Sequence, residues 1–177
     1  MKFRELTEKE IDARVATVSE KGCSLLLYKD ARCDMRILDE TVGAERWQRK
    51  HELINGNLFC SVGINFPTAE GCDHWVWKQD VGTESYTEKE KGQASDAFKR
   101  ACFNWGIGRE LYTAPFIWIP AKDVTLAQKN GKWTTYDKFK VEQIIIKDGE
   151  IVALSIRNTS LKRRVFLYDV REKGADK

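Results

Sequence analysis

Residues 96–108 read Asp96-Ala-Phe-Lys-Arg-Ala-Cys-Phe-Asn-Trp-Gly-Ile-Gly108, and they predict one amphipathic helix that ends at a glycine. The apolar side chains of this helix share one face, which comprises Ala94, Ala97, Phe98, Ala101, Cys102 and Trp105. Lys99 and Arg100 flank that face, and Phe103 lies opposite it. Such a helix can pack on a sheet and still present cations to a polyanion.

The segment before this helix predicts three antiparallel strands. They cover residues 46–54, 58–66 and 73–81. Apolar and polar residues alternate along the second strand, and Asn55-Gly56 favours a type I′ hairpin turn between the first two. A capping box, Thr87-Glu88-Lys89-Glu90, then begins the long helix. The expected fold class is α+β, with an antiparallel β-β-β-α core in which the helix packs across a curved three-stranded meander.

Two further helices are predicted ahead of the sheet. Thr7-Glu8-Lys9-Glu10 is another capping box and indicates a helix over residues 8–18. A second helix is expected over residues 30–42, and Gly43 ends it. The apolar stripe of this second helix comprises Ala31, Met35, Leu38 and Val42. Residues 24–28, between the two helices, read either as a short buried strand or as a loop.

The C-terminal part of the chain predicts a β-hairpin. Residues 141–147 and 151–157 have strand character and flank Asp148-Gly149, a strong hairpin signal. Residues 163–167 predict one more strand. The polar stretch over residues 121–140 has no clear periodicity, so no element is assigned to it.

The composition is that of a single globular domain, which we expect over residues 1–170 with a frayed tail over 171–177. The net charge of the 177 residues is only +3, so any basic surface must be local. The five cysteines lack paired spacing, which favours reduced thiols in a cytoplasmic protein. The first residues lack the apolar region of a signal peptide, and no apolar run reaches membrane-spanning length.

Motifs for catalysis are scarce. No phosphate-binding Gly-x-x-x-x-Gly-Lys-Ser/Thr loop occurs, and no Glu-x-Lys or Asp-x-Lys element of a metal-dependent nuclease is found. Gly106-Ile-Gly108 follows a helix, which is the wrong order for a dinucleotide-binding turn. Cys72-Asp73-His74 with Cys60 lacks a second ligand pair, so strand-borne core cysteines are the better interpretation. We expect no catalytic residue, no cofactor and no metal, and hence no enzyme.

Basic residues are better organised, because several stand close to aromatic residues. Arg49 follows Trp47 on the first strand of the sheet, and Lys78 follows Trp75 and Trp77 on the third. Single-strand binding proteins combine cations that track phosphates with rings that contact bases. The alternative interpretation is that each of these tryptophans is a core residue and that a C-terminal cluster of cations forms a solvated face. That cluster comprises Arg157, Lys162, Arg163 and Arg164.

Two neighbouring motifs resemble the Rad52/22 family of single-strand annealing proteins. In that family an Asp-Val-Gly strand end precedes a helix that reads roughly Ala-x-Thr/Ser-Asp-Gly/Ala-Leu/Phe-Lys-Arg-Ala, and an aromatic-Gly pair comes after the helix. Here Gln79-Asp-Val-Gly82 precedes Ala94-Ser-Asp-Ala-Phe-Lys-Arg-Ala-Cys-Phe-Asn-Trp-Gly106. The resemblance covers about residues 24–112, and the short chain looks like a phage-encoded member.

The resemblance implies homo-oligomeric rings and a basic groove that holds single-stranded DNA with its bases accessible. Lys99 and Arg100 match the paired basic residues of the family's helix, and Arg32 falls one position from an arginine of the preceding helix. Phe103 replaces a further arginine of the family, and its ring, opposite the buried face, suggests an oligomer interface. The expected DNA-binding residues are Lys99, Arg100, Arg32, Arg49, Lys78 and Arg109.

The predicted function is ATP-independent binding of single-stranded DNA and annealing of complementary strands in phage homologous recombination. The expected partners are single-stranded DNA, copies of this chain in a ring or filament, and host or phage replication and recombination proteins, without a membrane. Three alternatives stay open. They are a protective single-strand-binding module without annealing activity, a nuclease or other DNA enzyme with an unorthodox site, and an assembly protein without a nucleic-acid partner.

Overall fold

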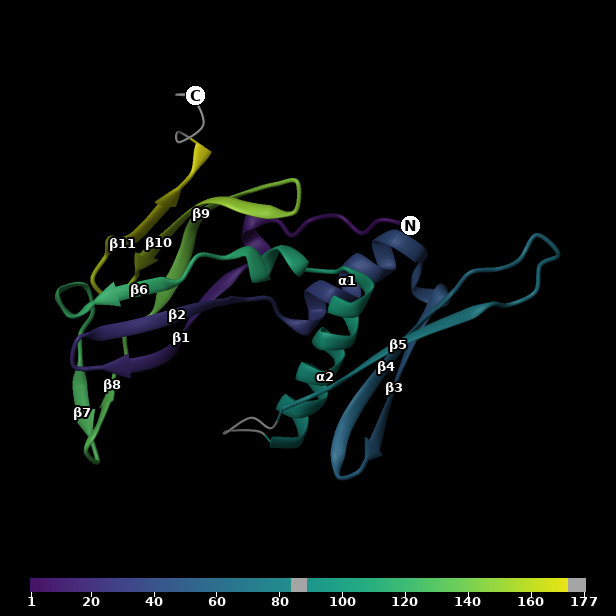
Figure 1. The fold of residues 1–177 in the computed structure, drawn as a ribbon, viewed down its shortest axis with the longest axis horizontal. Helices are drawn as coiled ribbons and strands as arrows, with labels where there is room; N and C mark the ends of the chain where they lie inside the picture. The colour runs from purple at the N-terminus through teal and green to yellow at the C-terminus, as the bar shows by residue number, and fades with distance from the viewer. Residues whose placement is uncertain (84–88, 172–177) are drawn as a thin grey trace. The chain divides into compact units, whose positions relative to one another are not determined.

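The computed structural model describes residues 1–83 and 89–171, and these residues form a mixed α/β structure with antiparallel sheets (Figure 1). This agrees with the mixed class predicted from the sequence. The chain divides into two compact units. Unit 1 comprises Met1–Arg4 and Asp30–Gly108, and unit 2 comprises Glu5–Lys29 and Arg109–Lys177. A single domain over residues 1–170 stays a prediction.

Unit 1 is built on a three-stranded antiparallel sheet in the order β3-β4-β5. Its strands are β3 (Trp47–Ile54), β4 (Asn57–Asn65) and β5 (Trp75–Val81). Asn55 and Gly56 both have positive φ, 50° and 79°, as the predicted type I′ turn between β3 and β4 requires. The register places Trp47, Arg49 and His51 on the same side of the sheet as the fully buried Ile64, Val62 and Cys60.

Helix α2 (Lys89–Trp105) follows β5 and contacts β4 and β5. Ala97, Phe98, Ala101 and Cys102 are fully buried, which confirms the centre of the predicted apolar face. Ala94 and Trp105, at the two ends of that face, are only half-buried. The predicted capping box at Thr87 lies outside the described residues.

Helix α1 (Ala31–Val42) confirms the second predicted helix. The carboxylate of Asp30 accepts a hydrogen bond from the Cys33 N–H and caps the helix, and Gly43 ends it with a φ of 87°. The predicted stripe was right only at Leu38, because Ala31, Met35 and Val42 are half-buried and the other buried residues are Cys33, Asp34 and Ile37. Packing of α1 against α2 and β3, together with the 3₁₀ turn η2 (Ala44–Arg46), selects this face rather than the one that composition favoured.

Unit 2 contains two three-stranded antiparallel sheets, in the orders β1-β2-β6 and β11-β10-β9. The first consists of β1 (Asp12–Ser19), β2 (Gly22–Tyr28) and β6 (Ile117–Pro120). The second consists of β9 (Phe139–Lys147), β10 (Glu150–Asn158) and β11 (Arg163–Asp169). Strand β1 contacts β9, and β6 contacts β11, so the two sheets share a core. Its buried side chains include Leu25, Ile117, Ile119, Leu154 and Ile156.

The predicted helix over residues 8–18 is wrong, because the chain forms strand β1 there. The carboxylate of Glu10 accepts hydrogen bonds from both the N–H and the hydroxyl of Thr7, but this capping contact closes only the 3₁₀ turn η1 (Glu8–Glu10). The β-branched residues Val15, Thr17 and Val18 then favour extended backbone, which β1 satisfies by pairing with β2. The strand alternative for residues 24–28 is confirmed by β2.

The stretch over residues 121–140 contains a small hairpin that its composition did not reveal. After the 3₁₀ turns η3 (Arg109–Thr113) and η4 (Ala121–Asp123), β7 (Ala127–Lys129) pairs with β8 (Lys132–Thr134). Asn130-Gly131 makes the turn with φ values of 51° and 74°. This dipeptide is a hairpin signal that could have been read from the sequence. The predicted hairpin at Asp148-Gly149 and the final strand are confirmed by β9, β10 and β11.

The five cysteines are not joined by disulfides, and four of them are buried. Desolvation raises the pKa of Cys23, near the carboxylate of Asp137, to about 11. Burial likewise raises the pKa of Cys60 to about 11, although the nearby guanidinium of Arg49 lowers it slightly. Neither helix of the described residues has the length and apolar character that crossing a membrane requires.

Truncating the buried ring of Phe98 should destabilise unit 1 strongly. Phe98→Ala removes a fully buried ring that stacks on Trp47, so we expect the free energy of unfolding to fall by about 3–5 kcal/mol in denaturant titrations. Phe116→Ala is the matched control, because that ring is 78% exposed and its loss should change stability by no more than about 0.5 kcal/mol. Equal effects of the two variants would contradict the packing of α2.

Alkylation should separate Cys72 from the other cysteines. Cys72 is exposed, whereas Cys23, Cys33, Cys60 and Cys102 are buried. Because the thiolate is the reactive form, iodoacetamide near neutral pH should add one group, on Cys72, to the folded protein and five groups after denaturation. Peptide mapping that finds a buried cysteine modified in the folded protein would overturn this expectation.

Candidate nucleic-acid interface

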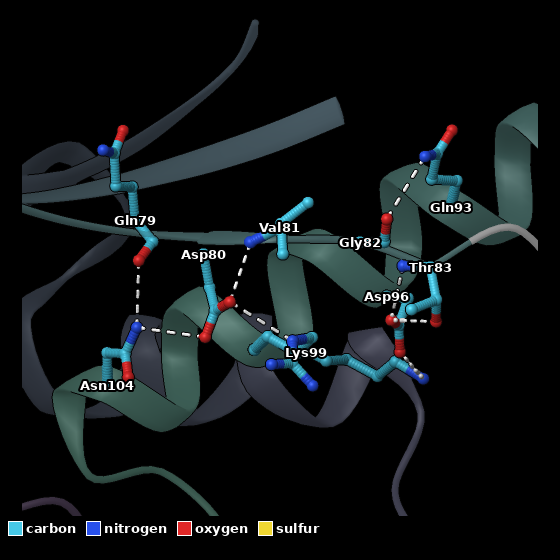
Figure 2. Close-up of polar contacts among 10 residues, drawn as sticks. Gln79, Asp80, Val81, Gly82, Thr83, Gln93, Asp96, Lys99 and Asn104 are labelled. Atoms are coloured by element: carbon cyan, nitrogen blue, oxygen red, sulfur yellow. Dashed lines mark hydrogen bonds and ion pairs between the residues drawn. The ribbon is translucent and has the colours of Figure 1, made fainter. Parts of the chain in front are cut away.

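The end of strand β5 approaches the backbone of helix α2 closely at Gly82 (Figure 2). A Cβ at this position would lie 2.2 Å from the carbonyl oxygen of Gln93 and 2.8 Å from the nitrogen of Ala97. The side-chain amide of Gln93 donates a hydrogen bond to the Gly82 carbonyl over 3.2 Å. Only glycine fits between strand and helix here, which gives the glycine of the Asp-Val-Gly motif a physical reason.

Asp80 joins the same strand end to the C-terminal half of α2 (Figure 2). Its Oδ1 accepts hydrogen bonds from the Val81 N–H over 2.7 Å and from Nε of Arg100 over 3.3 Å. Its Oδ2 accepts from the side-chain amide of Asn104 over 3.3 Å, and this amide also donates to the carbonyl of Gln79 over 3.0 Å. The carboxylate therefore fixes Arg100 at the edge of β5.

Asp96 also links helix α2 to this strand end, from a position one turn before Arg100 (Figure 2). Its Oδ2 accepts hydrogen bonds from the N–H and the hydroxyl of Thr83, over 3.1 and 3.0 Å. Its Oδ1 lies 4.0 Å from Nζ of Lys99. Lys99 is half-buried and Arg100 is exposed, so adjacent cations of α2 each stand beside a carboxylate that also holds the strand end.

Arg49 and Lys78 lie on the face of the sheet that carries α2, one on either side of Val62 in the same cross-strand row. The guanidinium of Arg49 stands 4.6 Å from the ring centroid of Phe98. Nζ of Lys78 stands 4.7 Å from the ring centroid of Trp105 and donates to the carbonyl of Asn104 over 2.9 Å. Both cations thus cover aromatic rings of α2, and Lys78 also satisfies a carbonyl at the C-terminus of α2.

A family model agrees with the motif that these contacts explain. The model of the Rad52/22 family double-strand break repair protein matches residues 4–133, well over half of the chain. The chain belongs to the Rad52/22 family. Neither a curated protein nor a solved structure matches it. Membership places the protein in DNA repair and recombination, and the matched region includes all of α1, the β3-β4-β5 sheet and α2 but ends before β9.

The remaining predicted site residues of this family member lie on other elements. Arg32 is exposed on α1, in unit 1. Arg109 is exposed at the start of η3 and belongs to unit 2. Phe103 is half-buried on α2. The roles of Arg32 and Arg109 in DNA binding and of Phe103 in oligomer formation stay predictions.

The tryptophans of the sheet lie on both of its faces. Trp47 is half-buried and stacks on Phe98 with ring centroids 6.0 Å apart, as its core interpretation requires. Trp77 lies on the face away from α2, where it covers Gly63, stacks on Trp75 and is 40% exposed. Nζ of Lys50 stands 5.5 Å from the Trp77 ring centroid. Gly63, inside β4, was a sequence signal for this contact, because a glycine within a strand often marks a close approach of another group.

The interpretation of Cys60 and Cys72 as core residues is right for Cys60 and wrong for Cys72. Cys60 is fully buried on β4. Cys72 is exposed instead, in the loop between β4 and β5, where its N–H donates to the hydroxyl of Thr68. Backbone hydrogen bonds from Thr68 to Cys72 and from Gly71 to Thr68 close this loop, and strand β5 begins only at Trp75. Asp80 and Asp96 are part of the motif that resembles the family, but the sequence did not reveal that they anchor the strand end to the helix.

Replacing Gly82 should loosen the helix that carries Lys99 and Arg100. In Gly82→Ala the methyl group collides with the backbone of α2, so the helix must shift and hydrogen exchange of its amides should speed up. Gly71→Ala is the matched control. Gly71 has a φ of 80° but nothing lies within 4 Å of its Cβ position, so its replacement should cost local strain only and leave exchange in α2 unchanged. Unchanged exchange in both variants would show that the close approach is not needed.

Proposed function

We propose that this Rad52/22 family member binds single-stranded DNA and anneals complementary strands without ATP, in the recombination system of a phage. Family membership supports a role in DNA repair and recombination. The observation that carries the finer proposal is the anchored pair Lys99 and Arg100 on α2, beside the Asp80-Val81-Gly82 strand end. The β3-β4-β5 sheet with α2 is, in this proposal, the β-β-β-α annealing core.

The geometry of Arg100 suits a phosphate contact. Its hydrogen bond to Asp80 uses Nε, and the guanidinium carries four further N–H donors on its terminal nitrogens. Asp80 holds the planar group in one orientation, so less side-chain entropy is lost when a phosphate binds. Lys99 adds a second positive charge on the adjacent residue, with a looser contact to its own carboxylate. Together they can neutralise the backbone of one strand and lower the repulsion that opposes pairing.

Binding at one subunit should be weak, because Asp80 and Asp96 offset part of the charge. Copies of the chain in a ring or filament, with Phe103 at the interface between them, would sum such contacts along the strand. Phosphates carry no sequence information, so any complementary pair of strands can be annealed. Exposed Arg32, on α1, is the further candidate for the same strand in unit 1.

The deciding experiment times the annealing of two complementary oligonucleotides with and without the protein, in the absence of any nucleoside triphosphate. The proposal requires that the protein accelerate annealing and that rising salt reduce the effect. Tight single-strand binding without acceleration would identify a protective module instead. Digestion of either strand in the presence of magnesium would identify a nuclease.

Removing the charge of either α2 cation should weaken single-strand binding. Lys99→Gln and Arg100→Gln each remove one phosphate contact, so each should lower the affinity and reduce the slope of log K against log salt by about 0.7. Lys9→Gln removes an exposed lysine on η1 and serves as the charge-matched control. Thermal melts should match the wild type, since neither cation is buried. Wild-type affinity and slope in both variants would exclude α2 from the DNA contact.

A further inference from the structure

Three cations stand in one row across the β11-β10-β9 sheet of unit 2. Arg157 on the central strand β10 lies opposite Lys140 on β9 and opposite Arg164 on β11. Residues directly opposite each other in an antiparallel sheet project from the same face, so the three side chains are neighbours. All three residues lie beyond residue 133, where the family match ends, so nothing about them follows from family membership.

β-bulges lie next to this row. The register of β10 with β9 shifts between Ile151 and Ala153, where Val152 is the extra residue, and shifts back between Ser155 and Ile156, where Glu142 is the extra residue. The register of β10 with β11 shifts between Ile156 and Arg157, where Val165 is the extra residue. If the register at Ser155 continued unchanged on both sides, Arg157 would lie between two valines, Val141 and Val165. The bulges at Glu142 and Val165 place Lys140 and Arg164 opposite Arg157 instead, and bulges commonly redirect side chains at functional sites.

The carboxylate of Glu142 contacts two of the three cations. Oε2 of Glu142 accepts a hydrogen bond from Nε of Arg164 over 2.6 Å, and its Oε1 accepts from a terminal nitrogen of Arg157 over 3.4 Å. The hydrogen bond from Arg164, followed by the contacts with Arg157, lowers the pKa of Glu142. Like charges directly opposite each other destabilise a sheet, and one carboxylate cannot neutralise three of them. The row therefore keeps a net positive charge.

Two further lysines, two ion pairs and an exposed leucine lie around the row. Lys138, before β9, and Lys162, before β11, are exposed at the same end of the sheet, and Arg157 donates to the carbonyl of Lys162. Arg163 is paired with Asp123 at 3.1 Å. Further along the same face Leu167 is 68% exposed opposite Ser155, and Asp169 is paired with Arg171.

We propose that the row of Lys140, Arg157 and Arg164 is a second nucleic-acid site, which binds the phosphates of a single strand. The Arg157 and Arg164 side chains are 44% and 49% exposed, so their guanidinium groups are accessible. Neighbouring strands lie about 4.8 Å apart, so three cations span about 10 Å, which suits successive phosphates of a chain better than one free phosphate. Glu142 holds the two guanidinium groups in place until phosphates bind.

This inference rests on the proposed function, in which α2 of unit 1 binds one DNA strand. The row of Lys140, Arg157 and Arg164 would bind a second strand. Annealing requires two strands, and cations on unit 2 would let one subunit hold a second strand in addition to the strand bound at α2 of unit 1. The two sites use the same chemistry, but one lies on helix α2 of unit 1 and the other on a sheet of unit 2, so each can be removed by substitution without changing the residues of the other.

The test measures capture of a second strand. The protein is saturated with an unlabelled poly-thymidine oligonucleotide, and binding of a labelled, non-complementary oligonucleotide is then titrated at several salt concentrations. The double variant Lys140→Gln/Arg164→Gln should bind the first strand like the wild type but the second strand about tenfold or more weakly. Its salt slope should fall by about 1.4, for two lost phosphate contacts. Lys147→Gln, at the other end of β9, is the matched control and should change nothing.

Glu142→Gln gives the sharper test, because it keeps the size and hydrogen-bonding capacity of the side chain but removes its charge. If the carboxylate occupies the place of a phosphate, this variant should bind the second strand severalfold more tightly. A carboxylate that only supports the sheet predicts equal or weaker binding, and that result overturns the proposal. Circular dichroism melts of each variant check that the sheet stays folded.

The outcomes separate this inference from the proposed function. Second-strand binding that the double variant leaves unchanged overturns the second site, even if the protein anneals DNA. Loss of second-strand binding in the double variant supports the site, even if no annealing occurs. Competition by inorganic phosphate at an equal concentration of phosphate groups would identify a site for a free anion and overturn the assignment to a strand.

Discussion

Unit 1 depends on the contact between Gly82 and the backbone of helix α2. A side chain at that position would collide with the carbonyl of Gln93, and the helix would have to move away from the strand. The carboxylates of Asp80 and Asp96 could then no longer reach both the strand end and the helix. Since these carboxylates also position Arg100 and Lys99, the close packing of one glycine decides where the cations of the helix lie.

The two units hold arginines in the same way. In unit 1 the carboxylate of Asp80 fixes Nε of Arg100, and in unit 2 that of Glu142 fixes Nε of Arg164. A fixed guanidinium loses less freedom on binding an anion, but its carboxylate offsets part of the charge. This balance fits a chain whose net charge is only +3. Other cations, such as Arg49 and Lys78, cover aromatic rings, and their roles in DNA binding stay predictions.

Much of the fold could be predicted, because its signals are local. Helices α1 and α2 have apolar residues at helical spacing and glycines at or just beyond their ends, and the β3–β4 and β9–β10 hairpins are joined by Asn-Gly and Asp-Gly. The helix over residues 8–18 was wrong because its capping box is equally satisfied by one 3₁₀ turn. Beyond that turn the chain is extended because β1 pairs with β2, and no local signal reports this pairing.

For the candidate sites, the sequence alone determined that a helix with one apolar face carries the adjacent cations Lys99 and Arg100, and that this helix comes after an Asp-Val-Gly strand end. Only the tertiary structure decided which carboxylate each cation meets, and that Lys78 binds a helix carbonyl. It also decided the row of Lys140, Arg157 and Arg164, because β-bulges set the register of three strands. Periodicity depends on a few neighbouring residues, whereas register and ion pairs depend on contacts between residues far apart in the chain.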